Sequence, residues 1–198
     1  MRVSAVEGSW KDVRKRARVL MVLDTSGSMS GSKIDLMRRG AAASIGLLLD
    51  DDELGIWEFS TGRSEVAPIG PVGPRRATLD AQIARLTAAG ATRLYDTTYE
   101  AVRTLAADAD ARRITAVVVL TDGMNSTSPG GNSDVDRLLR DLRGATAETH
   151  VRVFTIAYGS DADRDVLQRI ADATQGAAYD ASNPSSIETV FKEVISNF

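Results

Sequence analysis

The sequence predicts an α/β fold, in which a doubly wound, mostly parallel sheet is covered by helices on both faces. Short apolar runs alternate along the chain with segments whose apolar residues recur at helical spacing. The apolar runs are continuous, which is typical of strands buried on both faces of a sheet. Strands that alternate with helices in this way favour parallel pairing, because each helix carries the chain back to the starting edge.

The strand predictions rest on these runs and on the residues that flank them. The run Ile114–Leu120 is the most apolar and β-branched of the chain, which favours a central position in the sheet. The run Arg63–Ile69 contains Pro68 and follows Gly62, which indicates an edge strand. In chain order, the predicted strands are Val19–Leu23, Leu54–Phe59, Arg63–Ile69, Ile114–Leu120, Val151–Ala157 and Ala177–Tyr179.

The helix predictions rest on apolar residues three and four positions apart. The last predicted helix shows this spacing at Ile187, Val190, Phe191 and Val194. Two of the segments are followed by a glycine that is expected to end the helix. One of these glycines is Gly144. In chain order, the predicted helices are Lys33–Leu49, Ala77–Ala88, Leu94–Ala107, Ser133–Arg143, Asp163–Ala173 and Ser186–Asn197.

The composition excludes several kinds of chemistry. The chain of 198 residues has no cysteine and one histidine, so disulfides, thiol nucleophiles and two-histidine zinc sites are excluded. A metal ion would therefore be held mostly by oxygen, which favours hard cations. The formal net charge of −3 argues against a dedicated nucleic-acid binder.

The length suits one domain with a full core. We assign residues 1–17 to a charged lead-in segment and residues 18–198 to the domain. The lead-in lacks the apolar stretch of a signal peptide, so we expect a cytoplasmic protein or a piece of a longer one. The longest apolar runs, such as Ala116–Leu120, are too short to span a bilayer, so we expect no membrane insertion.

Oxygen-bearing side chains gather in three loops that precede helices. Asp24, Ser26 and Ser28 alternate directly after the first strand, Thr92 lies before the helix at 94–107, and Asp122 follows the most apolar strand. In open α/β sheets, ligands bind outside the carboxyl ends of the strands. Two carboxylates and three hydroxyls at one edge of the sheet are oxygen ligands that suit a divalent cation.

Asp-x-Ser-x-Ser after a first strand, a Gly-Ala-Thr loop and a later Thr-Asp-Gly resemble the von Willebrand factor type A domain. The resemblance covers 18–198 and implies a Rossmann-like sheet of six strands in the order 3-2-1-4-5-6, with the third strand antiparallel at the edge. It also implies a metal-ion-dependent adhesion site. Its ligands here would be Asp24, Ser26, Ser28, Thr92 and Asp122.

The function that this resemblance implies is recognition without turnover, so we expect a domain that is not an enzyme. The bound ion would be Mg²⁺ or Mn²⁺, with Ca²⁺ as an alternative. A protein partner would complete the coordination with an Asp or Glu carboxylate, and the isolated domain is expected to be monomeric. Some members of the family couple ligation to movement of the last helix, here Ser186–Asn197.

A narrower similarity is to bacterial surface proteins in which a solute-binding-like domain precedes a C-terminal type A domain. It is carried by Trp10 with Arg14-Lys15, by 92–97, by Ala116–Asn125 and by Ala178–Asn183. It implies a cell-surface or extracytoplasmic location within a longer protein. Two other functions stay open: a structural or regulatory subunit beside an ATPase or chelatase, and a metal-dependent hydrolase. The hydrolase is disfavoured because the loops hold no evident general base and no phosphate-binding motif.

Simpler interpretations compete for several of these residues. Asp and Ser before a helix commonly act as helix caps and turn residues. The segment Gly27–Lys33 has one residue too few between its glycines for a phosphate-binding loop. Asp161, Asp163 and Asp165 alternate as in a calcium loop, but capping explains them better, because Val166 stands where a glycine is needed.

The remaining polar and apolar features have structural interpretations. We interpret the basic run Arg14–Arg18 and the acidic run Asp50–Glu53 as solvated segments, and His150 as a structural or exposed residue. Tyr95 and Met29 flank the site loops, where packing is a better explanation than partner contact. A further hypothesis places the side chains of 125–127 at the rim of the site.

Overall fold

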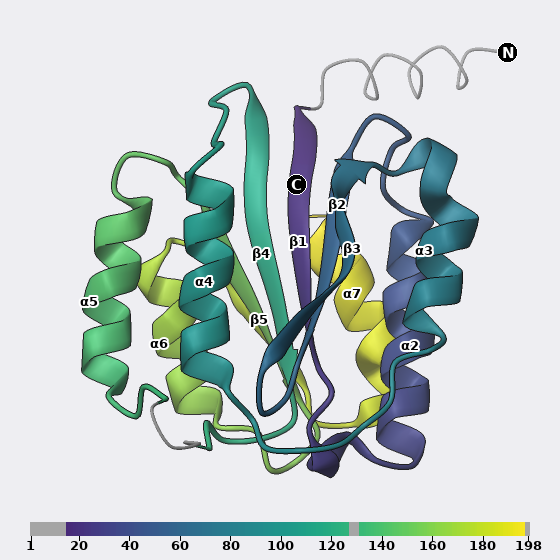
Figure 1. Cartoon of the computed structure of the whole chain (residues 1–198), viewed down its shortest axis with the longest axis vertical. Helices are drawn as coiled ribbons and strands as arrows, with labels where there is room; N and C mark the ends of the chain where they lie inside the picture. Colours follow the sequence, from purple (N-terminus) through teal and green to yellow (C-terminus); the bar gives the residue numbers. More distant parts are fainter. Residues whose placement is uncertain (1–14, 127–130, 197–198) are drawn as a thin grey trace, which may run out of the picture.

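The computed structural model describes residues 15–126 and 131–196, and its sheet confirms the predicted fold (Figure 1). The six strands are arranged in the order β3-β2-β1-β4-β5-β6. All neighbours pair in parallel except β2 and β3, which are antiparallel. The strands are β1 (Arg16–Asp24), β2 (Glu53–Phe59), β3 (Arg63–Pro71), β4 (Arg113–Thr121), β5 (Arg152–Tyr158) and β6 (Ala178–Ala181).

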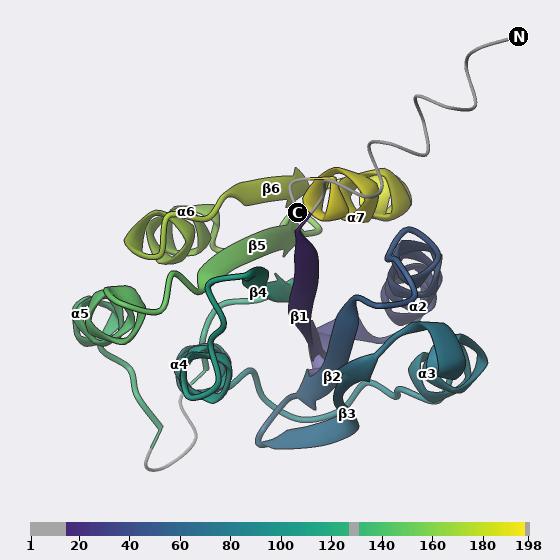
Figure 2. The same cartoon turned by 90° about the horizontal axis from the view of Figure 1, so that it is seen from above.

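Helices cover both faces of the sheet. In Figures 1 and 2, α4, α5 and α6 lie on one face, and α2, α3 and α7 lie on the other. The helices are α2 (Ser32–Ile45), α3 (Arg76–Ile83), α4 (Leu94–Ala106), α5 (Val135–Thr146), α6 (Arg164–Ala173) and α7 (Ile187–Ile195). None of the helices in the described residues has the length and apolar character needed to cross a bilayer.

The central strand β1 shows why the apolar runs are continuous. Its side chains alternate between two separate apolar cores: Val19 and Met21 pack on the side of α2, α3 and α7, whereas Leu20 and Val22 pack on the side of α4, α5 and α6. All four are fully buried. Burial on both faces removes the polar alternation of a half-exposed strand, so every position becomes apolar.

The predicted end of the first helix at Leu49 is wrong, because α2 ends at Ile45. Asp52 explains the difference. Its buried carboxylate accepts hydrogen bonds from the backbone N–H of Leu49 and of Ala17, both at 2.8 Å. These bonds turn the chain away from the helix axis and join it to the start of β1. The interpretation of Asp52 as a solvated residue is therefore also wrong.

Other predicted boundaries need smaller corrections. The helix predicted to stop before Gly144 continues through it to Thr146, because a helical glycine costs only about 1 kcal/mol. The helix predicted over Ala77–Ala88 ends at Ile83, although Leu86 beyond it still packs in the core. The strand β1 begins at Arg16, inside the predicted lead-in. Residues 1–14 and Asn197, the predicted end of the last helix, lie outside the described residues.

The sheet topology places a ligand-binding edge between β1 and β4. These strands are parallel neighbours, but the chain leaves β1 toward α2 on one face and leaves β4 toward α5 on the other (Figure 2). The loops after the two strands therefore diverge, and the carboxyl ends of β1 and β4 border a topological switch point. Asp24 is the last residue of β1, and Asp122 directly follows β4.

Candidate metal centre

The first strand–helix loop places three of the five candidate ligands. Asp24 ends β1, and Ser26 and Ser28 lie before and within a short 3₁₀ turn, Gly27–Met29, that leads into α2. The Asp24 carboxylate accepts a hydrogen bond from the Ser26 N–H at 2.7 Å. The hydroxyls of Ser26 and Ser28 are 3.0 Å apart. The alternating spacing therefore places these three side chains in one hydrogen-bonded row.

The second loop, after β4, joins this row. The Ser28 hydroxyl donates to one Asp122 carboxylate oxygen at 2.6 Å, although the two residues are 94 positions apart in the chain. The carboxylates of Asp24 and Asp122 are both fully buried. Four of the five candidate side chains thus form a continuous network across the carboxyl ends of β1 and β4.

The third loop places Thr92 beside the same network. A Cβ built on Gly123 would lie 3.5 Å from the Thr92 hydroxyl and 3.7 Å from the Ser28 hydroxyl, so both hydroxyls border this glycine. The backbone also ties this loop to the first, because the Gly27 N–H donates to the Gly90 carbonyl at 2.9 Å. All five candidate side chains therefore lie at one edge of the sheet, beyond the carboxyl ends of β1 and β4. These strand ends are at the lower end of Figure 1.

Asn125 and Ser126 hold the Thr92 loop in place. The Ser126 hydroxyl accepts from the Thr92 N–H at 2.7 Å, and the Ser126 N–H donates to the Thr92 carbonyl at 2.8 Å. The Asn125 side-chain oxygen accepts from the Tyr95 N–H at 3.1 Å. These two residues therefore join the loop after β4 to the Thr92 loop beside the site. Thr127, the third residue predicted at the rim, lies outside the described residues.

Two residues that sequence reasoning did not place at the site contact its carboxylates. The Thr121 hydroxyl donates to Asp24 at 2.5 Å and accepts from the Gly123 N–H at 3.2 Å. The Lys33 ammonium lies 2.5 Å from the second carboxylate oxygen of Asp122. Thr121 is the threonine of the Thr-Asp-Gly motif, but the resemblance assigns only Asp122 of that motif to the metal. A lysine in the first turn of a helix is an ordinary sequence feature, so no signal distinguishes Lys33.

Burial controls the electrostatics of Asp24. The pKa of this carboxyl is raised to about 6, chiefly by the loss of water on burial and to a smaller extent by the nearby Asp122 carboxylate. The hydrogen bonds from Thr121 and Ser26 oppose the shift by stabilising the charged form. A divalent cation beside both carboxylates would offset the same desolvation cost, because its charge favours their ionised forms.

The donor set fits a hard cation held by few carboxylates. Within residues 15–126 and 131–196, no three or more His, Cys, Asp or Glu side chains gather as a metal-binding group. The site instead combines two carboxylates with the hydroxyls of Ser26, Ser28 and Thr92. Mg²⁺ and Mn²⁺ accept such oxygen ligands and commonly retain water or an external ligand.

Other features that the sequence highlighted have structural roles. Asp163 accepts a hydrogen bond from the Val166 N–H at 3.1 Å and caps α6, as predicted. Met29 is buried in one apolar core and Tyr95 in the other, which confirms the prediction that these side chains pack inside the protein. His150 has a φ of +53° in the turn that precedes β5, at the opposite edge of the sheet from Asp24.

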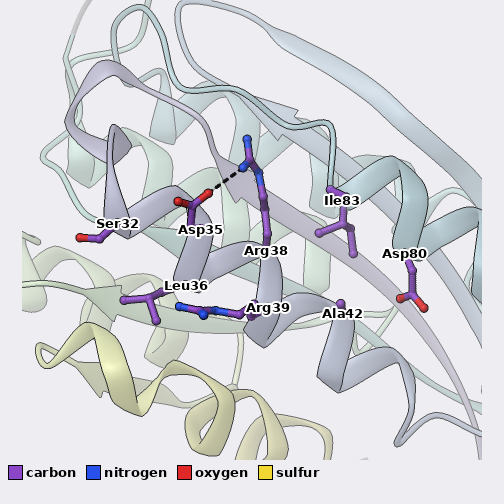
Figure 3. Close-up of a pocket in the computed structure, with 9 residues that line it drawn as sticks. Ser32, Asp35, Leu36, Arg38, Arg39, Ala42, Asp80 and Ile83 are labelled. Atoms are coloured by element: carbon purple, nitrogen blue, oxygen red, sulfur yellow. Dashed lines mark hydrogen bonds and ion pairs between the residues drawn. The ribbon is translucent and has the colours of Figure 1, made fainter.

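A separate groove lies between α2 and α3 (Figure 3). The side chains of Leu36, Ile83 and Ala42 give it an apolar lining, and an ion pair of 2.8 Å joins Asp35 to Arg38 at its border. None of the five candidate ligands lines this groove.

The comparison with protein families identifies the class of this chain. The model of the von Willebrand factor type A domain matches residues 19–193, so the chain belongs to this family. An uncharacterized protein of Synechocystis sp., sll0103, is 28% identical over 183 residues, which are 92% of this chain and 42% of the relative. The chain therefore spans less than half the length of this curated relative.

Solved structures share the fold at low sequence identity. A von Willebrand factor type A protein from Catenulispora acidiphila superposes with a TM-score of 0.78 and 22% identity, over 91% of this chain and 42% of that one. Proximal thread matrix protein 1 from the mussel byssus, with a zinc-occupied metal-ion-dependent adhesion site, gives 0.68 and 14%, over 91% and 47%. The pilus adhesin SpaC from Lactobacillus rhamnosus GG gives 0.71 and 16%, over 94% and 31%.

Proposed function

We propose that this domain is a non-enzymatic, divalent-metal-dependent recognition module that binds a carboxylate of a protein partner. The observation that carries the proposal is the convergence of three loops, which brings Asp24, Ser26, Ser28, Thr92 and Asp122 to one edge of the sheet. Family membership supports it, because type A domains commonly mediate metal-dependent protein interactions.

The side chains would hold the ion through complementary roles. The carboxylates of Asp24 and Asp122 supply negative charge from within the protein, and Thr121 and the Ser26 N–H orient the first of them. The hydroxyls of Ser26, Ser28 and Thr92 are neutral donors, so they add little further charge to the ion. Mg²⁺ or Mn²⁺ bound there would act as a Lewis acid that attracts an Asp or Glu carboxylate of the partner.

Two relatives support a role in adhesion. Proximal thread matrix protein 1 carries zinc at its metal-ion-dependent adhesion site, and SpaC is a pilus adhesin. We therefore propose an extracytoplasmic or cell-surface location within a longer protein, with the domain acting as a monomer. The charged groups that contact the two site carboxylates among the described residues include Lys33 but no histidine, which favours recognition over hydrolysis.

Isothermal titration calorimetry with MgCl₂, MnCl₂ and CaCl₂ tests the metal site. We expect the wild-type domain to bind Mn²⁺ and Mg²⁺, and Asp24→Asn and Ser28→Ala to lose most of this affinity. Ser30→Ala is the matched control, because Ser30 lies in the same loop but its hydroxyl donates to the Gly27 carbonyl at 2.8 Å. Equal heats for the wild type and Asp24→Asn, or no heat from either, would contradict the proposal.

Water-proton relaxation with bound Mn²⁺ tests the carboxylate partner. An ion that keeps exchangeable water gives enhanced relaxation, and a carboxylate that displaces this water lowers the enhancement. We expect acetate to lower it, and acetamide at the same concentration to leave it unchanged. An equal response to both would show that the site does not select carboxylates.

A further inference from the structure

Lys33 places a positive charge of the protein at the candidate metal site. Its ammonium lies 2.5 Å from one carboxylate oxygen of Asp122, while the Ser28 hydroxyl donates to the other oxygen at 2.6 Å. The Asp122 side chain is fully buried, and the Lys33 side chain is 25% exposed. The lysine therefore reaches from the molecular surface to a fully buried carboxylate of the site.

Helix stability does not explain a lysine at this position. Lys33 is the second residue of α2, where the positive end of the helix dipole disfavours a cation. The Tyr158 hydroxyl donates to its carbonyl at 2.9 Å, and its Cε and Nζ pass 3.6 Å from the Cβ position of Gly159. The side chain thus extends past the end of β5 toward Asp122, where the ion pair offsets the unfavourable helix position.

We propose that Lys33 is a tethered cation that competes with the divalent ion for Asp122 and so weakens metal binding. This inference rests on the proposed function and adds its regulation. A divalent ion beside Asp122 would repel an ammonium held at the same carboxylate. Because the lysine side chain is long and partly exposed, it can move into solvent when the ion binds.

The competition has a consequence for the partner. Two carboxylates, one divalent ion and the displaced lysine leave the loaded site with one net positive charge. A single carboxylate of the partner neutralises that charge. Lys33 therefore makes the loaded site more selective for an anionic group while keeping the ion exchangeable.

Calorimetric titration of Mn²⁺ into Lys33→Met tests the competition. A charge-assisted hydrogen bond contributes enough to change an equilibrium constant about tenfold or more, so we expect Lys33→Met to bind Mn²⁺ about tenfold more tightly than the wild type. Lys192→Met is the matched control, because it removes the same charge from an exposed pair with Glu188 on α7. Its affinity should stay within about twofold of the wild type, since exposed charges are screened.

The stability of the metal-free protein gives a second readout. In EDTA, Lys33→Met should melt at a lower temperature than the wild type, because the buried Asp122 carboxylate loses its ion pair with the Lys33 ammonium. Saturating Mn²⁺ should then stabilise this variant more than the wild type. If Lys33→Met does not melt cooperatively, Lys33→Gln and the charge-preserving Lys33→Arg replace it, and only the glutamine variant should bind more tightly.

The outcomes separate this inference from the proposed function. Wild-type binding with equal or weaker binding by Lys33→Met overturns the competition and leaves the metal site intact. Equal tightening in Lys33→Met and Lys192→Met also overturns it, because a general charge effect would then suffice. Binding by Lys33→Met but not by the wild type supports the competition and contradicts the proposed function of the native chain. No binding by the wild type, Lys33→Met or Lys33→Gln overturns both proposals.

Discussion

At the scale of single residues, Asp24 shows how the site holds a charge inside the protein. Its carboxylate is fully buried, yet it accepts hydrogen bonds from the Ser26 N–H and from the Thr121 hydroxyl. Each donor partly replaces the water that burial removes. Thr121 is thus a positioning residue for the site, although it is not one of the candidate ligands.

Replacing Thr121 by valine tests this role. The side chain keeps its shape but loses the hydroxyl, so Asp24 loses a buried donor. We expect the free energy of unfolding to fall by about 1–3 kcal/mol, and the affinity for Mn²⁺ to fall with it. Urea denaturation and calorimetry measure the two effects.

Thr98→Val is the matched control for Thr121→Val. Thr98 is also fully buried, but its hydroxyl has no hydrogen-bond partner in the part of the chain that the structure describes. Its removal should therefore be neutral or slightly stabilising, with unchanged Mn²⁺ affinity. Similar losses in both variants would indicate that Thr121 matters only through packing.

The sequence motifs could identify the five candidate ligands but not the residues that hold them. Asp24, Ser26 and Ser28 are recognisable because their spacing is unusual and because Asp122 follows a second strand end, with Thr92 in the loop before α4. Lys33 and Thr121 act through contacts between elements far apart in the chain. Thr121 belongs to the Thr-Asp-Gly motif, but its contact with Asp24, like that of Lys33 with Asp122, becomes visible only in the folded structure.

At the scale of elements, the strands are easier to predict than the ends of the helices. A strand buried on both faces has a continuous apolar sequence, as Ile114–Leu120 illustrates. Helix ends depend on distant partners: Asp52 ends the turn after α2 by binding the backbone of β1. Local propensity does not contain that information.

Two glycines provide opposite predictions for the same substitution. Gly144 lies inside α5, where an added Cβ would meet no atom within 4 Å, so Gly144→Ala should stabilise the protein by about 0.5–1 kcal/mol. At Gly176, before β6, a Cβ would lie 1.9 Å from the Val153 carbonyl oxygen. Gly176→Ala should therefore destabilise the protein by about 3 kcal/mol or more.

Thermal and urea denaturation of the two alanine variants measure these effects. Gly144→Ala reports the helical propensity of α5, and Gly176→Ala reports the close approach of the chain to β5. A loss of stability in Gly144→Ala would show that α5 ends at residue 143, as the sequence predicted. Unchanged stability in Gly176→Ala would contradict the packing at the start of β6.

The last helix depends on a close approach to α2. A Cβ on Gly40 would lie 3.1 Å from side-chain atoms of Ile187 and Phe191, so this glycine lets the two helices pack tightly. Phe191 is fully buried in the contact. We expect Phe191→Ala to cost about 3–5 kcal/mol, as is common for buried aromatic residues.

Glu188→Ala is the control for Phe191→Ala on the same helix. Glu188 is exposed and forms an ion pair of 2.8 Å with Lys192. Exposed pairs of this kind contribute about 0–1 kcal/mol, so the variant should melt close to the wild type. A small effect of Phe191→Ala in urea denaturation would show that α7 is loosely attached.

At the scale of the whole molecule, the order of the strands is what creates the site. Hydrophobic periodicity predicts that strands exist, but it does not say which strands are neighbours. That order followed from the family resemblance, and the structure confirms it. Because β1 and β4 are adjacent, Asp24 and Asp122 meet although almost a hundred residues separate them in the chain.

Metal binding should therefore stabilise the whole fold, because one ion would join loops that follow β1 and β4 and precede α4. A ligand at 100 times its dissociation constant stabilises the native state by about 2.7 kcal/mol. For a protein of this length, that corresponds to a rise in melting temperature of about 5–10 °C. Differential scanning calorimetry with Mn²⁺ at that excess should show this rise, and excess EDTA should reverse it. Asp24→Asn should show almost none, whereas Ser30→Ala should respond like the wild type. A similar rise in Asp24→Asn would place the stabilising ion elsewhere on the protein.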